Sequence, residues 1–529
     1  MPWSSTISTL DVVAIHAALL PTDNGDGQII LFGGDDHHRP SAPPTGKNYD
    51  HTRSFNCRTT QPLQYIQSPP WDVFCSGHAL LGDGRLLVAG GTAAFEKDAP
   101  PPHKNHHFAG HRKCATFTES STSFTEVADM MPQPLTAGTG GGRWYPTLCT
   151  LGTGEILALE GHPGGDDTRH ANNTPERYQP LANSWVGLPA IGEPRLGDPL
   201  LYPRSHLLND GDVFISSGIP NYNTNIKINP YTGAVVTLGS LPDDGDNAAE
   251  SYWSFHLPSV LLPLVPGDGY QSRILLCGKT PSQLYDFTHQ NLGWQTVLRD
   301  AQMDNVGRTH ACATLLPTGH VLLTGGADPN DDQKSTGNNP ELYHTPLDPV
   351  NKAYNAGVGS WETLNDPATL LRNYHSTALL MPDGRVWTAG GNGPNQPGEE
   401  ATTSQKQIEI YQPPYPQGPR PTISTCPPFV AFGQQFTSGV PSAGSIQNVV
   451  LMRCGSSTHA FNPDQRSIWL EFTKATDTLT ATAPPNGNIA PPGNYMVFVI
   501  DTSGRPCEYA KFIRLGESVS MFTSHNKIS

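Results

Sequence analysis

Apolar runs separated by glycine-containing turns recur along the first three quarters of the chain. In each copy an apolar strand leads to a turn that ends in Gly, and a second apolar strand ends at another Gly seven positions later. Clear copies read DGRLLVAGG, from Asp83 to Gly91, and DGRVWTAGG, from Asp383 to Gly391. Because a DG turn between β-rich runs is a strong hairpin signal, the pattern predicts a series of short β-hairpins.

Seven such copies occur, and their spacing predicts how they assemble. Their last glycines are Gly34, Gly91, Gly161, Gly218, Gly278, Gly326 and Gly391. The irregular intervals average near the spacing of about 50 residues that is typical of kelch repeats with variable loops. One hairpin cannot bury both of its faces, so the copies are expected to pack around an axis as blades. We therefore expect an all-β chain whose residues 1–413 form a seven-bladed kelch-type β-propeller, in preference to a stacked β-sandwich.

The pattern changes after residue 413. The segment Pro413–Pro421, PPYPQGPRP, predicts a stiff linker, because proline fixes φ and favours extended chain. Beyond it, the runs IQNVVLMRC, SIWLEFT, TLTATAPP and NYMVFVID predict short strands without the closing glycine. Residues 414–529 are therefore predicted to form a small antiparallel, immunoglobulin-like β-sandwich.

Composition and charge exclude several classes of protein. The net charge of −15 argues against a surface for nucleic acid or for an anionic membrane. No stretch approaches the roughly 20 apolar residues needed to span a bilayer. The first Lys or Arg is Arg39, which predicts no signal peptide and a cytoplasmic chain as the sequence is written. We also expect a monomer. The nine cysteines contain no CxxC pair, which excludes a zinc ribbon or a thioredoxin motif.

Side chains capable of chemistry share one position in the repeat. Counting back nine residues from the turn glycine of the second, third, sixth and seventh blades reaches Cys75, Tyr145, His310 and His375. Equivalent positions in a propeller lie at equivalent radius and height, so these side chains are predicted to converge near one end of the axis. The second and third blades are neighbours, which places Cys75 within reach of Tyr145.

This set of side chains favours a redox metal. Imidazole suits Cu, Zn, Fe or Ni, and a set of Cys, Tyr and His with open coordination is more typical of redox copper than of Mg or Ca. No pair of carboxylates shares the same position, so the register gives no support for a glycosidase.

Four strings of residues resemble the copper radical oxidases, the family that includes galactose oxidase and glyoxal oxidase. The strings are DVFCSGHALLGDG around Cys75, GGRWYPT around Tyr145, RNYHSTALLMPDG around Tyr374 and His375, and CGSSTHAFNPDQR around His459. They follow one another in the family's order along nearly the whole chain. The strings RWYPT and FCSG look closer to glyoxal oxidase than to galactose oxidase.

The resemblance implies one copper ion and a cofactor made from the protein itself. Cys75 and Tyr145 would be joined by a thioether, and Tyr145 would bind copper and hold a radical. His375 and His459 would be the nitrogen ligands, and Tyr374 would be the axial ligand that takes the hydroxyl proton of the substrate. Such an enzyme would oxidise a small aldehyde or a primary alcohol with O2 and release H2O2. The resemblance also suggests a secreted protein, in contrast to the missing export signal.

One departure from the family concerns the ring that covers the radical tyrosine. Galactose oxidase stacks a tryptophan there, from the segment just after the closing glycine of the third blade. In this chain that segment is Gly161–Asp167, GHPGGDD, with Pro163 at the corresponding register. We therefore expect no stacking tryptophan, and a small aldehyde, its hydrate or a simple primary alcohol as substrate in place of galactose.

Other interpretations remain open from the sequence. A non-catalytic kelch propeller would bind a protein or glycan partner through loops on one face, and a hydrolase would use another metal, such as zinc, at the same position. Cys75 is alternatively an ordinary buried thiol, and Tyr145 a packing residue between blades. We expect His310 to pack behind the ligands and Arg204 to face the substrate mouth.

Overall fold

Strands account for nearly all of the regular structure. The computed structural model describes residues 2–9, 12–33, 52–60, 64–95, 108–132, 141–163, 172–191, 201–216, 224–240, 257–278, 281–299, 308–328, 331–335, 339–392 and 405–517. The helical segments within these ranges are three short 3₁₀ helices, η2 (Pro266–Asp268), η3 (Phe287–Leu292) and η4 (Ala443–Ser445). No helix in the described part is long and apolar enough to cross a membrane. The predicted all-β class is confirmed.

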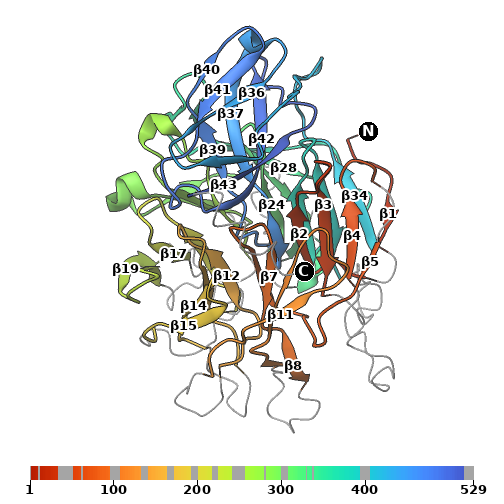
Figure 1. Cartoon of the computed structure of the whole chain (residues 1–529), viewed down its shortest axis with the longest axis vertical. Coiled ribbons are helices and arrows are strands. Elements are labelled where there is room, and N and C mark those ends of the chain that lie inside the picture. Colours follow the sequence, from red (N-terminus) through yellow and green to blue (C-terminus); the bar gives the residue numbers. More distant parts are fainter. Residues whose placement is uncertain are drawn as a thin grey trace.

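Seven sheets of antiparallel strands follow one another along the first part of the described chain, and we number them 1 to 7 (Figure 1). Sheets 1 to 4 contain the strands β2 (His16–Leu20), β3 (Gln28–Phe32), β4 (Thr52–Asn56) and β5 (Gln64–Ile66); β6 (Gly77–Leu80), β7 (Leu86–Ala89), β10 (Cys114–Phe117) and β11 (Thr125–Val127); β12 (Thr147–Thr150), β13 (Ile156–Leu159), β14 (Glu176–Gln179) and β15 (Ser184–Gly187); and β16 (Arg204–Leu207), β17 (Val213–Ser216), β18 (Thr224–Ile228) and β19 (Val235–Ser240). Sheets 5 to 7 contain β20 (Ser259–Leu261), β21 (Arg273–Leu276), β22 (Ser282–Asp286) and β23 (Trp294–Val297); β24 (Cys312–Leu315), β25 (Val321–Thr324), β28 (Glu341–His344) and β31 (Ser360–Thr363); and β32 (Ser376–Leu380), β33 (Val386–Gly390), β34 (Gln407–Tyr411) and β1 (Ile7–Ser8). Three small hairpins extend from these sheets: β8 (Thr92–Phe95) with β9 (Phe108–Gly110), β26 (Ala327–Asp328) with β27 (Asp331–Ser335), and β29 (Leu347–Asp348) with β30 (Ala353–Tyr354).

The first strands of several neighbouring sheets lie against one another. Strand β12 contacts both β6 and β16, and β24 contacts both β20 and β32. Strand β32 in turn contacts β2 of sheet 1, although the two are far apart in sequence. Sheet 7 is completed by the N-terminal strand β1, whose Ile7 pairs with Ile408 of β34. Both ends of the first part of the chain therefore meet in one sheet.

The repeated DG turn explains the hairpins at residue level. In sheet 2, Gly84 has a φ of 93°, which costs little only for glycine. Asp83 accepts a hydrogen bond on Oδ1 from the backbone N–H of Arg85 at 3.1 Å, and its carboxylate pairs with the guanidinium of the same residue at 2.6 Å. The turn in sheet 7 repeats this geometry with Asp383 and Arg385.

Two further sheets form the last part of the chain, which gathers at one end of the molecule (Figure 1, blue). The larger has the order β35 (Phe429–Ala431), β43 (Lys511–Gly516), β42 (Gly493–Asp501), β37 (Ile446–Arg453) and β39 (Ser467–Leu470), and the smaller has β36 (Gln435–Gly439), β41 (Thr478–Thr482) and β40 (Phe472–Lys474). The expectation of a wholly antiparallel sandwich is wrong in one place, because β35 pairs with β43 in parallel. Strand β35 is the first strand of this part and lies at the edge of the sheet. It runs in the same direction as its neighbour β43, the last strand of the described chain.

The linker predicted at residues 413–421 contains no strand and is packed against the first part of the chain. The Tyr415 hydroxyl donates to the carbonyl of Gly384 at 2.8 Å, and Arg420 donates to the carbonyls of Asp383 and Pro506 at 2.7 and 2.8 Å.

Residues 453–466, which we name the crossing segment, return from the last part of the chain into the first. Their strand β38 (Ser456–Thr458) adds to sheet 1, where Thr458 pairs with His16 of β2. Further contacts join this segment to the first strands of sheets 2, 4 and 6: Arg453 to the Leu80 carbonyl (2.8 Å), Arg466 to the Leu207 carbonyl (3.0 Å) and Gln465 to the Leu315 N–H (3.0 Å). Asp464 of this segment also accepts a hydrogen bond from Thr150 of sheet 3 at 3.0 Å, and β38 contacts β32 of sheet 7. The crossing segment therefore touches six sheets and fixes both parts of the chain to each other.

Candidate metal centre

Five residues just ahead of the first strands of their sheets have left-handed backbone conformations. Their φ values are 60° at Cys75, 64° at Tyr145, 44° at Tyr202, 57° at His310 and 67° at His375. Non-glycine residues rarely adopt such φ values. Each costs on the order of 1–3 kcal/mol and persists only where the surrounding structure holds it. All five lie nine residues before the turn glycine, so the strain belongs to the repeat and turns these side chains in a common way.

Main-chain hydrogen bonds link three of these residues from sheet to sheet. The N–H of Tyr145 donates to the carbonyl of Cys75 at 2.9 Å, and the N–H of Tyr202 donates to the carbonyl of Tyr145 at 2.8 Å. The Tyr202 hydroxyl also donates to the carbonyl of Ser76 at 2.7 Å. Cys75 and Tyr145 are therefore held side by side by the backbone.

Buried arginines stabilise the segments just ahead of the first strands, which we name the lead-ins. Each lies two or three residues before a left-handed residue, donates to main-chain carbonyls of its own sheet, and faces a glutamate at the start of the third strand. The pairs are Arg143–Glu176 (2.8 Å) in sheet 3, Arg308–Glu341 in sheet 6 and Arg372–Glu409 (3.6 Å) in sheet 7. In the sequence, the three glutamates share a recurring Glu-x-Tyr pattern at these strands.

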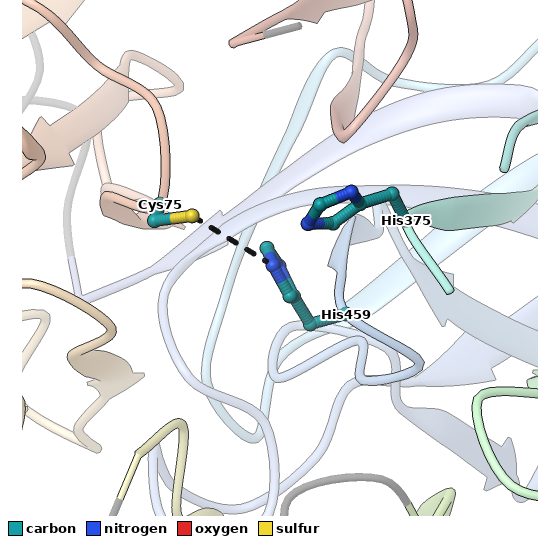
Figure 2. Close-up of side chains that lie close together, drawn as sticks. All are labelled: Cys75, His375 and His459. Atoms are coloured by element: carbon teal, nitrogen blue, oxygen red, sulfur yellow. Dashed lines mark hydrogen bonds between the residues drawn. The ribbon is translucent and has the colours of Figure 1, made fainter. Parts of the chain in front are cut away.

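Three donor side chains from distant parts of the sequence converge at one buried point (Figure 2). One ligand atom each from Cys75, His375 and His459 lies within 4.8 Å of the others. The Cys75 Sγ and the His459 Nε2 are 3.9 Å apart. His459 reaches this point from the crossing segment, whereas Cys75 and His375 come from the lead-ins of sheets 2 and 7.

Two phenol groups complete the cluster. The hydroxyls of Tyr145 and Tyr374 are in direct contact. Tyr145 is buried and its side chain interacts with that of Cys75. Tyr374 is only half-buried and stacks on His375, with ring centroids 3.7 Å apart. The structure thus brings together all five residues singled out from the sequence, with Tyr374 as the most accessible.

Neighbouring groups orient both imidazoles. Nδ1 of His375 donates to Oδ1 of Asn392 at 3.0 Å, which leaves the lone pair on Nε2 for coordination. Nδ1 of His459 lies 2.6 Å from the Thr458 hydroxyl, and its Nε2 faces Cys75. Asn392 and Thr458 did not emerge from the sequence, since neither lies at the shared repeat position.

Burial sets the charge state of the cluster. Burial, reinforced by His375, lowers the pKa of His459 well below its usual value of 6.5, so its ring is the neutral ligand form. Burial, reinforced by Cys75 and Tyr374, raises the pKa of the Tyr145 phenol well above its usual value of 10. A bound cation reverses the second effect, because it favours the phenolate.

These residues fit a copper ion. Two imidazoles and two phenol oxygens form a nitrogen and oxygen set that suits tetragonal Cu(II). The hydroxyls of Tyr145 and Tyr374 touch, and the imidazoles of His375 and His459 lie close together, so that one cation could bind them together. The thiol of Cys75 adjoins the same point.

The expectation that no tryptophan stacks on Tyr145 is wrong. Pro163 does follow the closing glycine of sheet 3, but Trp144 supplies the ring instead, with centroids 3.9 Å apart and planes 10° apart. The opposite neighbour of Tyr145 is Tyr202, at 4.6 Å. Register alone could have found Tyr202, which lies nine residues before Gly211. Trp144 was visible in the RWYPT string, but its direction depends on the left-handed turn at Tyr145.

Two other sequence expectations concern residues near the cluster. Arg204 does not face a substrate mouth; it is buried at 1% exposure and donates to the carbonyl of His459 at 2.9 Å. Its position at the start of β16 points it inward between sheets. His310 is buried and packs on the ring of Tyr374 at 4.7 Å.

Comparison with known proteins gives a consistent picture. A family model described as glyoxal oxidase N-terminus matches residues 48–415, and one described as galactose oxidase-like, early set domain matches residues 420–515. An aldehyde oxidase from Vitis pseudoreticulata is 29% identical over 479 residues, covering 84% of this chain and 82% of that protein. A galactose oxidase from Gibberella zeae is 24% identical, covering 95% of this chain and 69% of that protein. The solved structure of a fungal alcohol oxidase in complex with copper superposes with a TM-score of 0.73 at 22% identity, covering 97% of this chain and 99% of the other.

Proposed function

The chain belongs to the glyoxal oxidase family of copper radical oxidases, and from that premise we propose that it oxidises a small aldehyde or a primary alcohol with O2 and releases H2O2. The observation that carries the proposal is the convergence of two phenols, two imidazoles and one thiol at a single buried point. For an alcohol, two hydrogens leave the carbinol group and both are found in H2O2, so that aldehyde and peroxide are the balanced products.

Four side chains would hold one copper ion: Tyr145, Tyr374, His375 and His459. When bound, copper supplies one-electron oxidation, and the protein stores the second oxidising equivalent. The imidazoles of His375 and His459 offer their Nε2 atoms, because Asn392 and Thr458 engage the Nδ1 atoms.

Cys75 and Tyr145 would form a thioether cofactor. The thiol S–H and one ring C–H are lost, a C–S bond forms, and two electrons with two protons pass to O2 to give H2O2. The main-chain hydrogen bond between the two residues and the contact of their side chains hold the sulfur against the ring for this step. A thioether-substituted phenol stabilises an unpaired electron, and the overlying ring of Trp144 excludes water from one face of it.

Tyr374 would act as the general base. It is the least buried member of the cluster, so it is the one that an incoming substrate meets first. As a phenolate it would accept the hydroxyl proton of the substrate at its Oη atom, and its contact with the Tyr145 hydroxyl supports this role. Stacking on His375 and packing on His310 hold the ring in place.

The fold that supports this site would be a closed seven-bladed propeller of residues 1–413, followed by an immunoglobulin-like domain of residues 414–529. The contacts between successive first strands and the completion of sheet 7 by β1 support ring closure. In this arrangement the second domain takes part in catalysis, because it delivers His459.

The test is peptide mass spectrometry after aerobic loading with copper. We expect the Cys75 and Tyr145 peptides to be joined with loss of two hydrogens, and H2O2 release from small aldehydes or primary alcohols. Cys75→Ser should abolish both, whereas Cys114→Ser, an equally buried thiol in sheet 2, should abolish neither. Separate peptides in a protein that has bound copper would refute the radical cofactor and favour a propeller that only binds a partner.

A further inference from the structure

His459 lies at the tip of an unusual two-residue turn. The N–H groups of Thr458 and Phe461 each donate to the carbonyl of the other at 2.9 Å, which closes a tight hairpin. The two residues between them, His459 and Ala460, have φ values of 46° and 62°. Positive φ at both central positions is the pattern of a type I′ turn, which strongly favours Asn-Gly.

Neither residue of this turn suits its conformation. Left-handed backbone is unfavourable for a residue that has a Cβ. His459 and Ala460 therefore both oppose the turn, and contacts from outside the hairpin must hold it.

Arg204 makes such a contact. Its guanidinium donates to three main-chain carbonyls: Nη2 to His459 at 2.9 Å, Nε to Leu257 at 2.9 Å and Nη1 to Tyr202 at 3.3 Å. These carbonyls belong to the crossing segment and to the lead-ins of sheets 5 and 4. The same guanidinium lies over the ring of Phe461, 5.1 Å from its centroid. One planar fork thus joins the strained turn to two sheets of the first part of the chain.

We propose that Arg204 is a positioning residue for the metal centre, which fixes the main chain of His459 so that its imidazole faces Cys75 and His375. The inference rests on the proposed role of His459 as a copper ligand. The inference adds that the guanidinium of Arg204, in the first part of the chain, holds the main chain of His459, which belongs to the last part.

Other buried arginines of the interface differ in what they hold. Arg466 is also buried, and it donates to the carbonyls of Leu207, Ile489 and Asn488. None of these carbonyls belongs to the turn. Arg466 therefore serves as a matched control that removes an interface guanidinium without touching His459.

The experiment compares copper binding and the electron paramagnetic resonance (EPR) spectrum of bound Cu(II) in full-length variants. Groups that orient metal ligands typically contribute about 10–100-fold to metal affinity. We expect Arg204→Met to weaken copper binding by about that factor and to change the EPR spectrum of the bound fraction. We expect Arg204→Lys to fall between, because an ammonium can reach one carbonyl but lacks the planar fork. Arg466→Met should lower the thermal midpoint and leave both copper readouts at their wild-type values.

The substitution Ala460→Gly tests whether Arg204 acts through the turn. If Arg204 only stabilised the fold, this substitution would not restore copper affinity. Glycine relieves the turn strain that Arg204 opposes, so adding Ala460→Gly to Arg204→Met should recover part of the lost copper affinity. Wild-type affinity and an unchanged spectrum in Arg204→Met, or in Arg204→Lys if the Met variant does not fold, would overturn the inference. His459→Ala separates the two levels of the argument: unchanged copper binding in that variant refutes the ligand assignment itself.

Discussion

The brace behind Tyr145 gives a stability prediction whose size can be worked out from the structure. Arg143 and Glu176 have no exposed side-chain surface, and their charged atoms are 2.8 Å apart. The second carboxylate oxygen of Glu176 accepts the N–H of Met131 at 2.7 Å. An amide in place of this carboxylate removes the negative charge and cannot accept from both Arg143 and Met131.

Glu176→Gln should therefore destabilise the protein strongly. Breaking a buried ion pair by removing one charge costs about 3–5 kcal/mol, because the remaining charge stays buried without compensation. Glu155→Gln in the same sheet is the matched control. Glu155 pairs with Arg177 at 2.5 Å, but both side chains are partly exposed, and such pairs contribute about 0–1 kcal/mol.

The assay is urea unfolding of the metal-free protein, followed by tryptophan fluorescence. We expect a large decrease in the midpoint for Glu176→Gln and a small one for Glu155→Gln. Equal shifts for the two variants would refute the reasoning that burial makes the Arg143 brace strong. Because Arg143 directly precedes Trp144 and Tyr145, Glu176→Gln should also reduce the yield of the Cys75–Tyr145 cross-link on copper loading.

Two further predictions follow from side chains around the cluster. Trp144→Ala removes the ring stacked on Tyr145, so the radical absorbance generated by chemical oxidation should decay faster while copper affinity stays unchanged; equal lifetimes would contradict the shielding role. Burial lowers the pKa of His206 to about 3, so the unfolded chain binds a proton below pH 6.5 that the native chain does not. Stability should fall as the pH is lowered, by about 2 kcal/mol at pH 5 for this residue. Urea titrations at pH 7 and pH 5 should show a weaker pH dependence for His206→Gln than for the wild type.

The sequence predicted those features that the repeat itself determines. The all-β class follows from turn glycines and apolar runs, and the proximity of Cys75 to Tyr145 follows from their equal distance to the turn. Features that the repeat does not determine could not be predicted correctly from the sequence. Trp144 stacks on Tyr145 only because the backbone turns left-handed there, and Arg204 points inward because of its place on β16. Both depend on conformation and not on residue type.

His459 shows where sequence reasoning needs tertiary structure. The string around it marked a functional residue by resemblance, but no periodicity relates it to the repeats. Its reach into the first part of the chain depends on β38 joining sheet 1 and on the hydrogen bond from Arg204 to its carbonyl.

The crossing segment also orders events during biosynthesis. The ribosome makes Cys75, Tyr145 and Tyr374 well before His459, and β38 can pair with β2 only after about 440 residues of intervening chain have been synthesised. The nascent chain therefore lacks the His459 imidazole until the crossing segment has been synthesised. Chains that end before the crossing segment would carry Tyr145 and Cys75 but not His459, so the proposed site would be incomplete in them. If Cys75 and Tyr145 form the proposed cross-link, this order of synthesis prevents it from forming before His459 is in place.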